Sequence, residues 1–210
     1  MRLDLYVVTD ERIARGRSHH EVARRAVEGG ADAVQLRDKE MGGRRLLQAA
    51  HEVREATAGA LFIVNDRLDI ALASGADGVH LGQDDLPVPA ARRLCPQWFI
   101  IGASVGTVEE GVQAAKDGAD YVALSPVFDT ASKGDAGPGR GLQTLRDLRS
   151  AVRVPIVGIG GITVRNVGEV IAAGADGAAV ISAVVAQGDI AAAARGLRSA
   201  IAAAKGQRGR

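Results

Sequence analysis

The chain has 210 residues, of which 47% are apolar but only 3% aromatic, and its 26 basic and 25 acidic residues leave a formal charge of +1. This length suits one domain, and the balanced charge excludes a general attraction to nucleic acid or to an anionic membrane. The shortage of aromatic side chains also disfavours stacking platforms for single-stranded nucleic acid. We therefore expect small phosphorylated ligands, with no nucleic-acid and no membrane partner.

The single cysteine, Cys95, excludes an internal disulfide framework and a multi-cysteine zinc site, which favours a cytoplasmic protein. No cleavable apolar segment begins the chain, and no stretch reaches the roughly 18 apolar residues of a membrane span. We expect residues 1–204 to form one domain and the basic residues 205–210 to form a disordered tail. Whether the chain forms a homo-oligomer is left open.

Strand-like and helix-like segments alternate along the chain. A Gly-Ala-Asp sequence followed by a short apolar run begins at Gly30, Gly75, Gly118 and Gly174. The glycine suits a left-handed helix C-cap, and the apolar run is typical of a buried parallel strand. With four further apolar runs, eight strands are predicted within 3–9, 30–36, 61–64, 75–81, 99–101, 118–124, 155–159 and 174–180. Amphipathic patterns predict helices at roughly 18–29, 42–58, 67–74, 88–94, 107–117, 142–150, 163–173 and 189–204.

Eight strand–helix units of about 26 residues each predict an α/β fold, a single (β/α)8 TIM barrel. A doubly wound open sheet is the alternative, but its glycine-rich first turn is replaced by Thr9-Asp10-Glu11-Arg12. The active site of a TIM barrel lies at the C-terminal ends of its strands. The residues that follow each apolar run are therefore the candidates for function.

At and just after the end of the second strand stand Gln35, Arg37 and Lys39, whose alternation along the chain puts them on one side. Two cations leaving a buried strand toward the barrel mouth predict phosphate binding. The alternative is that both cations are solvated or paired with nearby acids.

Carboxylates follow the third and fourth strands. Asn65 and Asp66 come directly after the third strand, and Asp84 and Asp85 come shortly after the fourth. Neighbouring strands bring these groups to one rim, where two carboxylates and an amide opposite a bound phosphate suit Mg²⁺. The alternative is that Asp66, and Asp84 or Asp85, cap the helices that follow. His80, on the fourth strand, is interpreted as a packed structural histidine rather than a catalytic one.

The other histidines, His19, His20 and His51, fall on predicted helices, and we expect them to be exposed. The sequence contains no evident Ser-His-Asp set, no lysine in an apolar strand and no cluster of metal-ligating histidines. Covalent nucleophilic catalysis is therefore disfavoured.

A connection of unusual length, 125–141, follows the sixth strand and contains Thr130, Ser132 and Lys133. Its glycines and hydroxyls suit a mobile lid over a bound anion, and a merely flexible insertion is the alternative.

Small residues follow the last two strands, at Gly160-Gly161 and at Ile181-Ser182. In these barrels, the corresponding loops commonly bind a phosphate monoester through backbone N–H groups. The sequence thus predicts two anion sites at one mouth: a magnesium-assisted pyrophosphate site from strands 2, 3, 4 and 6, and a metal-free monophosphate site from strands 7 and 8.

These motifs resemble the thiamine-phosphate synthase family over nearly the whole chain. The matching segments, in order and spacing, are 6–10, 35–39, 65–67, 75–85, 118–122, 126–128 with Thr130 and Lys133, and 158–162. The resemblance implies a transferase with two small phosphorylated substrates and Mg²⁺ as cofactor. It would couple 4-amino-2-methyl-5-hydroxymethylpyrimidine diphosphate to a thiazole phosphate or thiazole carboxylate phosphate, and release pyrophosphate and thiamine phosphate.

The resemblance also implies a role for each matching position. Asp66 and Asp85 would bind Mg²⁺. Pyrophosphate would be held by Arg37, Lys39, Asn65 and Lys133, the pyrimidine by Gln35 and Ser104, and the thiazole phosphate by Thr130, Ser132, Gly161, Ile181 and Ser182. The catalytic candidates among them are Lys39, Ser104 and Lys133. In the family, the carbon–oxygen bond breaks to give a methylene cation that the thiazole nitrogen captures, so no protein nucleophile is needed.

A sister family of thiazole tautomerases shares the barrel and the monophosphate site, and it supplies the alternative function. Its members carry a catalytic histidine after strand 6 and generally lack the magnesium carboxylates, whereas this chain has Ser125 there and keeps Asp66 and Asp85. The loop that ends in Gly139-Arg140-Gly141 nevertheless looks partly tautomerase-like. A third hypothesis, a non-catalytic binder of phosphorylated ligands, leaves the carboxylate pair unexplained.

Overall fold

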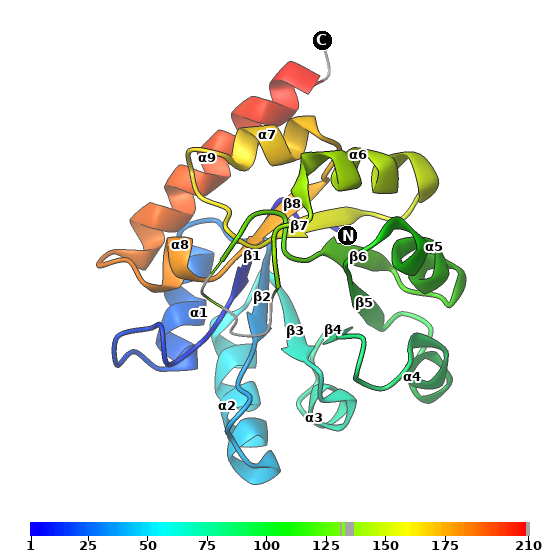
Figure 1. Ribbon diagram of the computed structural model, residues 1–210. Coiled ribbons are helices and arrows are strands. Elements are labelled where there is room, and N and C mark those ends of the chain that lie inside the picture. Colours follow the sequence, from blue (N-terminus) through cyan, green and yellow to red (C-terminus); the bar gives the residue numbers. More distant parts are fainter. Residues whose placement is uncertain (131, 133–136, 209–210) are drawn as a thin grey trace.

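Eight parallel strands close into a barrel in the computed structural model, which describes residues 1–130, 132 and 137–208 (Figure 1). Each strand pairs with the next along the chain, and β8 pairs with β1. The strands are β1 (Leu5–Val8), β2 (Ala33–Leu36), β3 (Leu61–Asn65), β4 (Gly78–Leu81), β5 (Ile100–Val105), β6 (Tyr121–Leu124), β7 (Ile156–Ile159) and β8 (Gly177–Val180). The TIM barrel is confirmed. β5 extends to Val105, beyond the predicted end at Ile101, so Ser104 lies on the strand itself.

Helices surround the barrel: α1 (His19–Glu28), α2 (Gly43–Ala56), α3 (Leu68–Ala73), α4 (Val88–Leu94), α5 (Val108–Lys116), α6 (Gly141–Ala151), α7 (Val167–Ala172), α8 (Ser182–Val185) and α9 (Ile190–Arg208) (Figure 1). The four-residue helix α8 was not predicted, because one turn is too short for a helical period to be visible. Helix α9 runs past the predicted end at 204, so 205–208 is helical where a disordered tail was expected. Lys205 Nζ donates to Asp4 Oδ1 over 2.6 Å and holds this last part of the helix against the start of the chain.

Two buried tyrosines, Tyr6 on β1 and Tyr121 on β6, lie inside the otherwise mostly aliphatic barrel, together with the buried polar residues Gln35 and His80. Gly102 on β5 makes room for Tyr121. A side chain at Gly102 would place its first carbon 2.1 Å from Tyr121 Cζ, so only glycine lets the aromatic ring lie across the barrel at this level. The tyrosine hydroxyls are thereby brought close to the mouth.

The four Gly-Ala-Asp joints build the same hydrogen-bonded unit four times at the N-terminal end of the barrel. Each aspartate accepts a backbone N–H from the preceding odd-numbered strand: Asp32 from Leu5 at 3.0 Å, Asp77 from Phe62 at 2.7 Å, Asp120 from Ile101 at 2.8 Å and Asp176 from Ile156 at 2.8 Å. Each also pairs with an arginine from a helix, namely Arg198, Arg54, Arg92 and Arg149 in that order. We call these four Asp–Arg pairs the staples.

Each staple joins two neighbouring strands and a helix, which fixes the lateral spacing of the strands at that end. The predicted role of Gly-Ala-Asp as a helix-to-strand joint is confirmed, and the arginine partners are an addition from the structure. Within the part of the chain that is described, no helix combines the length and apolar character needed to cross a bilayer.

Candidate functional site

A polar pocket opens at the C-terminal ends of β2 to β5. The predicted residues in its lining are Arg37, Lys39, Asn65, Asp66, Asp85 and Ser104, joined by His80, Asp84, Ser125 and Arg140. The structure therefore gathers almost all of the predicted pyrophosphate and metal residues at one place. Lys133, the remaining predicted cation, lies outside the described residues.

Asp66 has an unusual backbone conformation, with φ of 62°. Its backbone N–H donates to the His80 carbonyl over 2.8 Å, which anchors the turn to β4. A left-handed conformation is uncommon outside glycine and directs this side chain away from the helix that follows. The N-cap of α3 is Arg67, without a side-chain cap bond, so the predicted alternative that Asp66 caps α3 is wrong.

Asp85 also does not cap a helix. Its Oδ2 accepts the Gly82 N–H over 2.6 Å inside the β4–α4 turn, and the N-cap of α4 is Pro87. The turn leaves the carboxylate beside Asp66, with which it shares a hydrogen bond. The two acids meet across neighbouring strand ends, as expected from the topology.

The electrostatics of this carboxylate pair fit a divalent cation. Burial, followed by the hydrogen bond and the charge of Asp85, raises the pKa of Asp66 from 3.8 to about 6, and Lys39 and Arg37 only partly oppose this. Two carboxylates so close share a proton unless a cation lies between them. Their oxygens, with the neighbouring amide of Asn65, are the hard donors that Mg²⁺ prefers. The residues present therefore fit the predicted ion.

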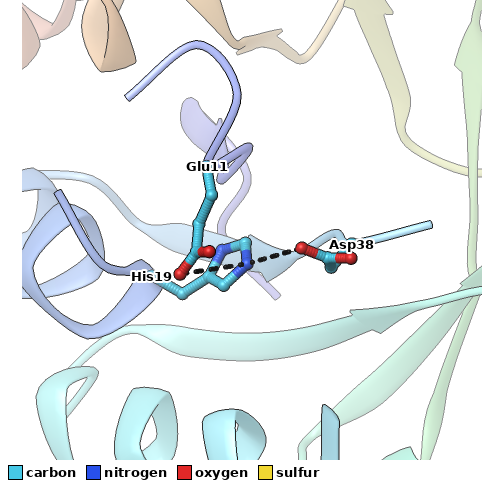
Figure 2. A group of neighbouring side chains, drawn as sticks. All are labelled: Glu11, His19 and Asp38. Atoms are coloured by element: carbon cyan, nitrogen blue, oxygen red, sulfur yellow. Dashed lines mark hydrogen bonds and ion pairs between the residues drawn. The ribbon is translucent and has the colours of Figure 1, made fainter. Parts of the chain in front are cut away.

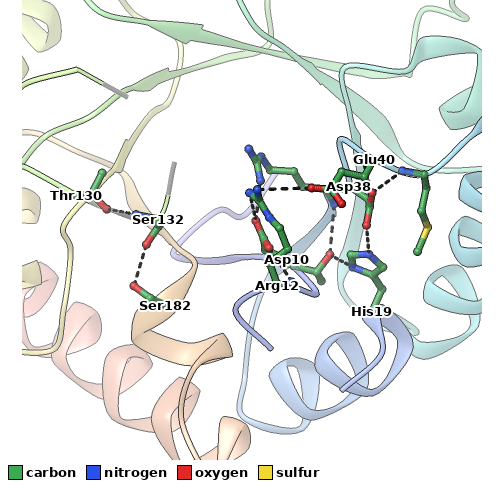
Figure 3. A network of polar contacts seen from close by, with 11 residues as sticks. Asp10, Arg12, His19, Asp38, Glu40, Thr130, Ser132 and Ser182 are labelled. Carbon is green, nitrogen blue, oxygen red and sulfur yellow. Dashed lines mark hydrogen bonds and ion pairs between the residues drawn. The ribbon is translucent and has the colours of Figure 1, made fainter. Parts of the chain in front are cut away.

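Arg37 lines the pocket but is also held by an acid that the sequence analysis did not assign. Its Nη1 donates to Asp10 Oδ2 over 2.8 Å, and both side chains are only 4% exposed. Arg12 contacts the same carboxylate from the surface side (Figure 3). The predicted alternative of pairing with a nearby acid thus holds for one nitrogen of Arg37. Asp10 lies two residues after the end of β1, so the expectation that functional residues follow the strands could have found it.

His19 is buried, with 2% of its side chain exposed, and the expectation that it is exposed is wrong. It is the first residue of α1 and faces the barrel, where its Nδ1 lies 2.6 Å from Thr9 Oγ1 and its Nε2 lies 3.3 Å from Asp38 Oδ2. Glu11 Oε1 lies 3.9 Å from the same Nε2, so both carboxylates face this nitrogen (Figure 2). These contacts join the turn after β1 to the turn after β2. They support the segment that carries Arg37.

Asp38 is fixed by backbone groups as well as by His19. Although burial opposes ionisation, N–H groups of Glu40 and Met41 and the His19 ring lower the pKa of this carboxyl. Its Oδ1 accepts those two N–H bonds at 2.8 and 2.7 Å, and its Oδ2 faces His19. The Asp38 carboxylate is thus held through Oδ1 by its own turn and through Oδ2 by His19.

A second pocket adjoins the first on the side of β6 to β8. It is lined by all five residues predicted for the thiazole phosphate: Thr130, Ser132, Gly161, Ile181 and Ser182. Ser132 Oγ donates to Ser182 Oγ over 3.0 Å, so the loop after β6 contacts the start of α8 (Figure 3). Ser125 lines both pockets, which places the two predicted sites side by side.

Gly161 has a conformation that suits no other residue well. Its φ is 64°, and a side chain there would come within 2.7 Å of the Asp129 carbonyl oxygen. The turn after β7 therefore lies directly against the loop after β6, which closes one wall of the second pocket.

A continuous series of hydrogen bonds connects Gln35 on β2 with Ser104 on β5. Gln35 Nε2 donates to Tyr6 Oη at 2.9 Å, Tyr6 Oη lies 3.0 Å from Tyr121 Oη, His80 Nδ1 lies 2.9 Å from Tyr121 Oη, and His80 Nε2 lies 2.9 Å from Ser104 Oγ. We call this series the Gln35–Ser104 chain. His80 is packed, as interpreted from the sequence, and stacks on Tyr121 with ring centroids 5.5 Å apart. The two tyrosines were missed, because nothing along the sequence indicates contacts across a barrel.

Comparisons with known proteins agree with this geometry. The family model for thiamine monophosphate synthase matches residues 5–184. The chain is 66% identical to a thiamine-phosphate synthase of Methanoculleus marisnigri over 99% of both chains, and 63% identical to one of Methanoregula boonei over 99% of this chain and 97% of the other. Among solved structures, a thiamine phosphate pyrophosphorylase from Pyrococcus furiosus superposes with a TM-score of 0.89 at 43% identity, over 96% of each chain.

Proposed function

The chain belongs to the thiamine monophosphate synthase family and is a transferase, and we propose that it joins 4-amino-2-methyl-5-hydroxymethylpyrimidine diphosphate to a thiazole phosphate or thiazole carboxylate phosphate with the help of Mg²⁺. The observation that carries the proposal is the contact of Asp66 with Asp85 inside a pocket that also holds Arg37 and Lys39. A metal-bound diphosphate needs carboxylates for the metal and cations for the phosphate oxygens, and this pocket supplies both.

The two adjoining pockets support a reaction between two phosphorylated molecules. The first pocket carries cations and the carboxylate pair, as a diphosphate with its metal requires. The second has hydroxyls and glycines and no carboxylate among its lining residues within the described chain, as a phosphate monoester requires. Ser125 stands where the pockets meet, so the reacting carbon and nitrogen would come together beside it.

In the first pocket, Asp66 and Asp85 would hold Mg²⁺, which when bound neutralises charge on the departing pyrophosphate. Lys39 would donate hydrogen bonds to the pyrophosphate oxygens, as would Asn65, and Arg37 would present the guanidinium nitrogens that Asp10 leaves unoccupied. Lys133 is proposed as the further cation from the loop. Stabilising the leaving group in this way is the main task of the protein in a dissociative substitution.

The pyrimidine would lie between Gln35 and Ser104, and the thiazole phosphate against Thr130, Ser132, Gly161, Ile181 and Ser182. With both substrates held in this way, the carbon–oxygen bond of the pyrimidine substrate would break as pyrophosphate leaves. The thiazole nitrogen would then supply the electron pair for the new carbon–nitrogen bond. A carboxylated thiazole then also loses carbon dioxide. Alignment of the two rings and exclusion of water are the contributions of the protein to this step.

The proposal is tested by incubating the purified protein with both substrates and following thiamine phosphate by mass spectrometry. We expect product and pyrophosphate in equal amounts with Mg²⁺, and neither product when EDTA is added or either substrate is omitted. Coupling at an undiminished rate in EDTA would contradict the metal-assisted reaction. Isomerisation of the thiazole carboxylate phosphate in EDTA, without any coupling, would instead support the tautomerase, which Ser125 disfavours.

A further inference from the structure

The Gln35–Ser104 chain permits one order of hydrogen-bond donors and acceptors. Gln35 donates to the Tyr6 oxygen, so the proton of Tyr6 is given to Tyr121, its other partner among the described residues. Tyr121 must then donate to His80 Nδ1. A neutral imidazole that accepts at Nδ1 carries its proton on Nε2, and His80 therefore donates to Ser104 Oγ.

This order leaves one donor and one acceptor for a ligand at the mouth. Ser104 Oγ already accepts from His80, so its own proton is available on the side of the polar pocket that it lines. Gln35 turns its amide nitrogen toward Tyr6, so its Oε1 forms the opposite end of the amide. No hydrogen bond within the described residues uses Oε1, so this oxygen is the acceptor that Gln35 can offer to a ligand.

Burial makes the order stable. Tyr6 and Tyr121 are within 1% of full burial, and His80 is 6% exposed. Burial raises the pKa of both tyrosines, which favours their protonated hydroxyls. An isolated glutamine could turn its amide over and an isolated serine could rotate its hydroxyl, whereas members of this series can change direction only together.

We infer that Tyr6, Tyr121 and His80 are positioning residues that hold Gln35 as an acceptor and Ser104 as a donor, and that they thereby select an aminopyrimidine over an oxopyrimidine. The inference rests on the proposed function, which places the pyrimidine between Gln35 and Ser104. An aminopyrimidine presents an amino donor beside a ring-nitrogen acceptor. An oxopyrimidine presents a carbonyl acceptor beside an N–H donor, which is the reverse pattern. The oxo compound would leave Gln35 Oε1 facing a carbonyl, and unpaired polar groups of this kind reject a ligand strongly.

The first test concerns the protein without any ligand. Nitrogen-15 NMR distinguishes the two neutral forms of a histidine, and the chain has four histidines to assign. We expect His80 at pH 8 to carry its proton on Nε2 and to have an unprotonated Nδ1, and in Tyr121→Phe we expect this preference to weaken. A proton on Nδ1 in the unaltered protein would overturn the inference.

The second test measures selectivity by calorimetry in the presence of Mg²⁺. The diphosphates of the 4-amino and the 4-oxo pyrimidine are titrated separately, and the ratio of their dissociation constants is compared between proteins. We expect this ratio to fall by about tenfold or more in Tyr121→Phe and in Tyr6→Phe. The ratio does not depend on the folded fraction, so a loss of stability would not imitate the result.

Thr57→Val is the matched control. Thr57 is also fully buried, and its hydroxyl donates to the Arg54 carbonyl at 3.1 Å, at the end of α2 and outside the Gln35–Ser104 chain. We expect its ratio to equal that of the unaltered protein. An unchanged ratio in both tyrosine variants would overturn the inference while leaving the coupling reaction intact. Absence of coupling in the unaltered protein would refute the proposed function instead.

Discussion

The two ends of the barrel are built on opposite plans. At the N-terminal end, the same staple occurs four times, with one aspartate, one arginine and one strand N–H in each. Among the described residues at the mouth, the polar side chains differ from strand to strand: the carboxylate pair and the cations line one pocket, and small residues and hydroxyls line the other. Closing a barrel poses the same geometric problem at every strand, so one solution repeats. Binding two different molecules requires an asymmetric surface.

The largest effect that would test this contrast is expected at the carboxylate pair. Asp85→Ala or Asp66→Ala should lower kcat/KM for coupling by about 10³-fold, because the metal that neutralises the leaving group is lost. The free energy of unfolding should stay the same or rise, since one of two repelling acids is removed. Asp84→Ala, at the neighbouring acid of the same pocket, is the control and should keep most of the activity. Full activity in both Asp66→Ala and Asp85→Ala would refute the assigned metal site.

A smaller effect is expected at the second pocket. Gly161→Ala should raise KM for the thiazole substrate on the order of 10²-fold, because the new methyl group strains the backbone and pushes against the Asp129 carbonyl in the loop that carries Thr130 and Ser132. KM for the pyrimidine substrate should change little. Gly168→Ala in α7 meets no atom within 4 Å and should behave as the unaltered protein in steady-state kinetics. Equal changes in both KM values would show that the pockets are not independent.

The opposite pattern is expected at the N-terminal end. Asp176→Ala should lower the free energy of unfolding by about 2 kcal/mol, because the Ile156 N–H and Arg149 both lose their charged partner. Urea titration measures this loss. The folded enzyme should retain its kcat/KM, since no substrate group reaches the staples. Asp147→Ala on the exposed face of α6 should leave the stability nearly unchanged, and a catalytic defect in Asp176→Ala would weaken the division between the two ends.

The smallest effect depends on pH. At the mouth, unlike at the staples, an ionised side chain is expected to lower the stability of the fold. Asp66 ionises near 3.8 in an unfolded chain and near 6 in the folded protein, so its ionisation destabilises the fold as pH rises between these values. In EDTA, Asp66→Asn should therefore be more stable than the unaltered protein by about 1 kcal/mol at pH 8. The gain should shrink as pH falls through 6 and vanish near 4. A gain that grows toward low pH would contradict the assigned shift.

The architecture was predictable because each strand and helix is indicated by a short pattern in its own segment of the sequence. The Gly-Ala-Asp joints and the apolar runs locate all eight strands. Because the active site of such a barrel lies at the C-terminal ends of the strands, the sequence alone then indicates Asp66, Asp85 and the small residues of the second pocket. Contacts between distant segments were not predictable in this way. Tyr121 reaches Tyr6 across the barrel because Gly102 leaves room for the ring of Tyr121.

The burial of His19 could not be predicted from the sequence either. A histidine in the first turn of an amphipathic helix belongs by pattern to the exposed side, but the way α1 enters the fold turns this residue toward Thr9 and Asp38. The entry angle of a helix depends on the turn before it and on the neighbouring loop. Neither is encoded in the periodicity of the helix itself.

One staple differs from the others in the length of chain that it closes. Arg54 and Asp77 are 23 residues apart, and the pairs at Asp120 and Asp176 span 28 and 27, but Arg198 and Asp32 are separated by 166. The entropy lost in closing the long loop exceeds that of a short one by about 1.5 kcal/mol. We therefore expect the junction between α9 and the first strands to close last and to open first. The unfolding rate and resistance to proteolysis should then respond more to changes at this junction than the folding rate does.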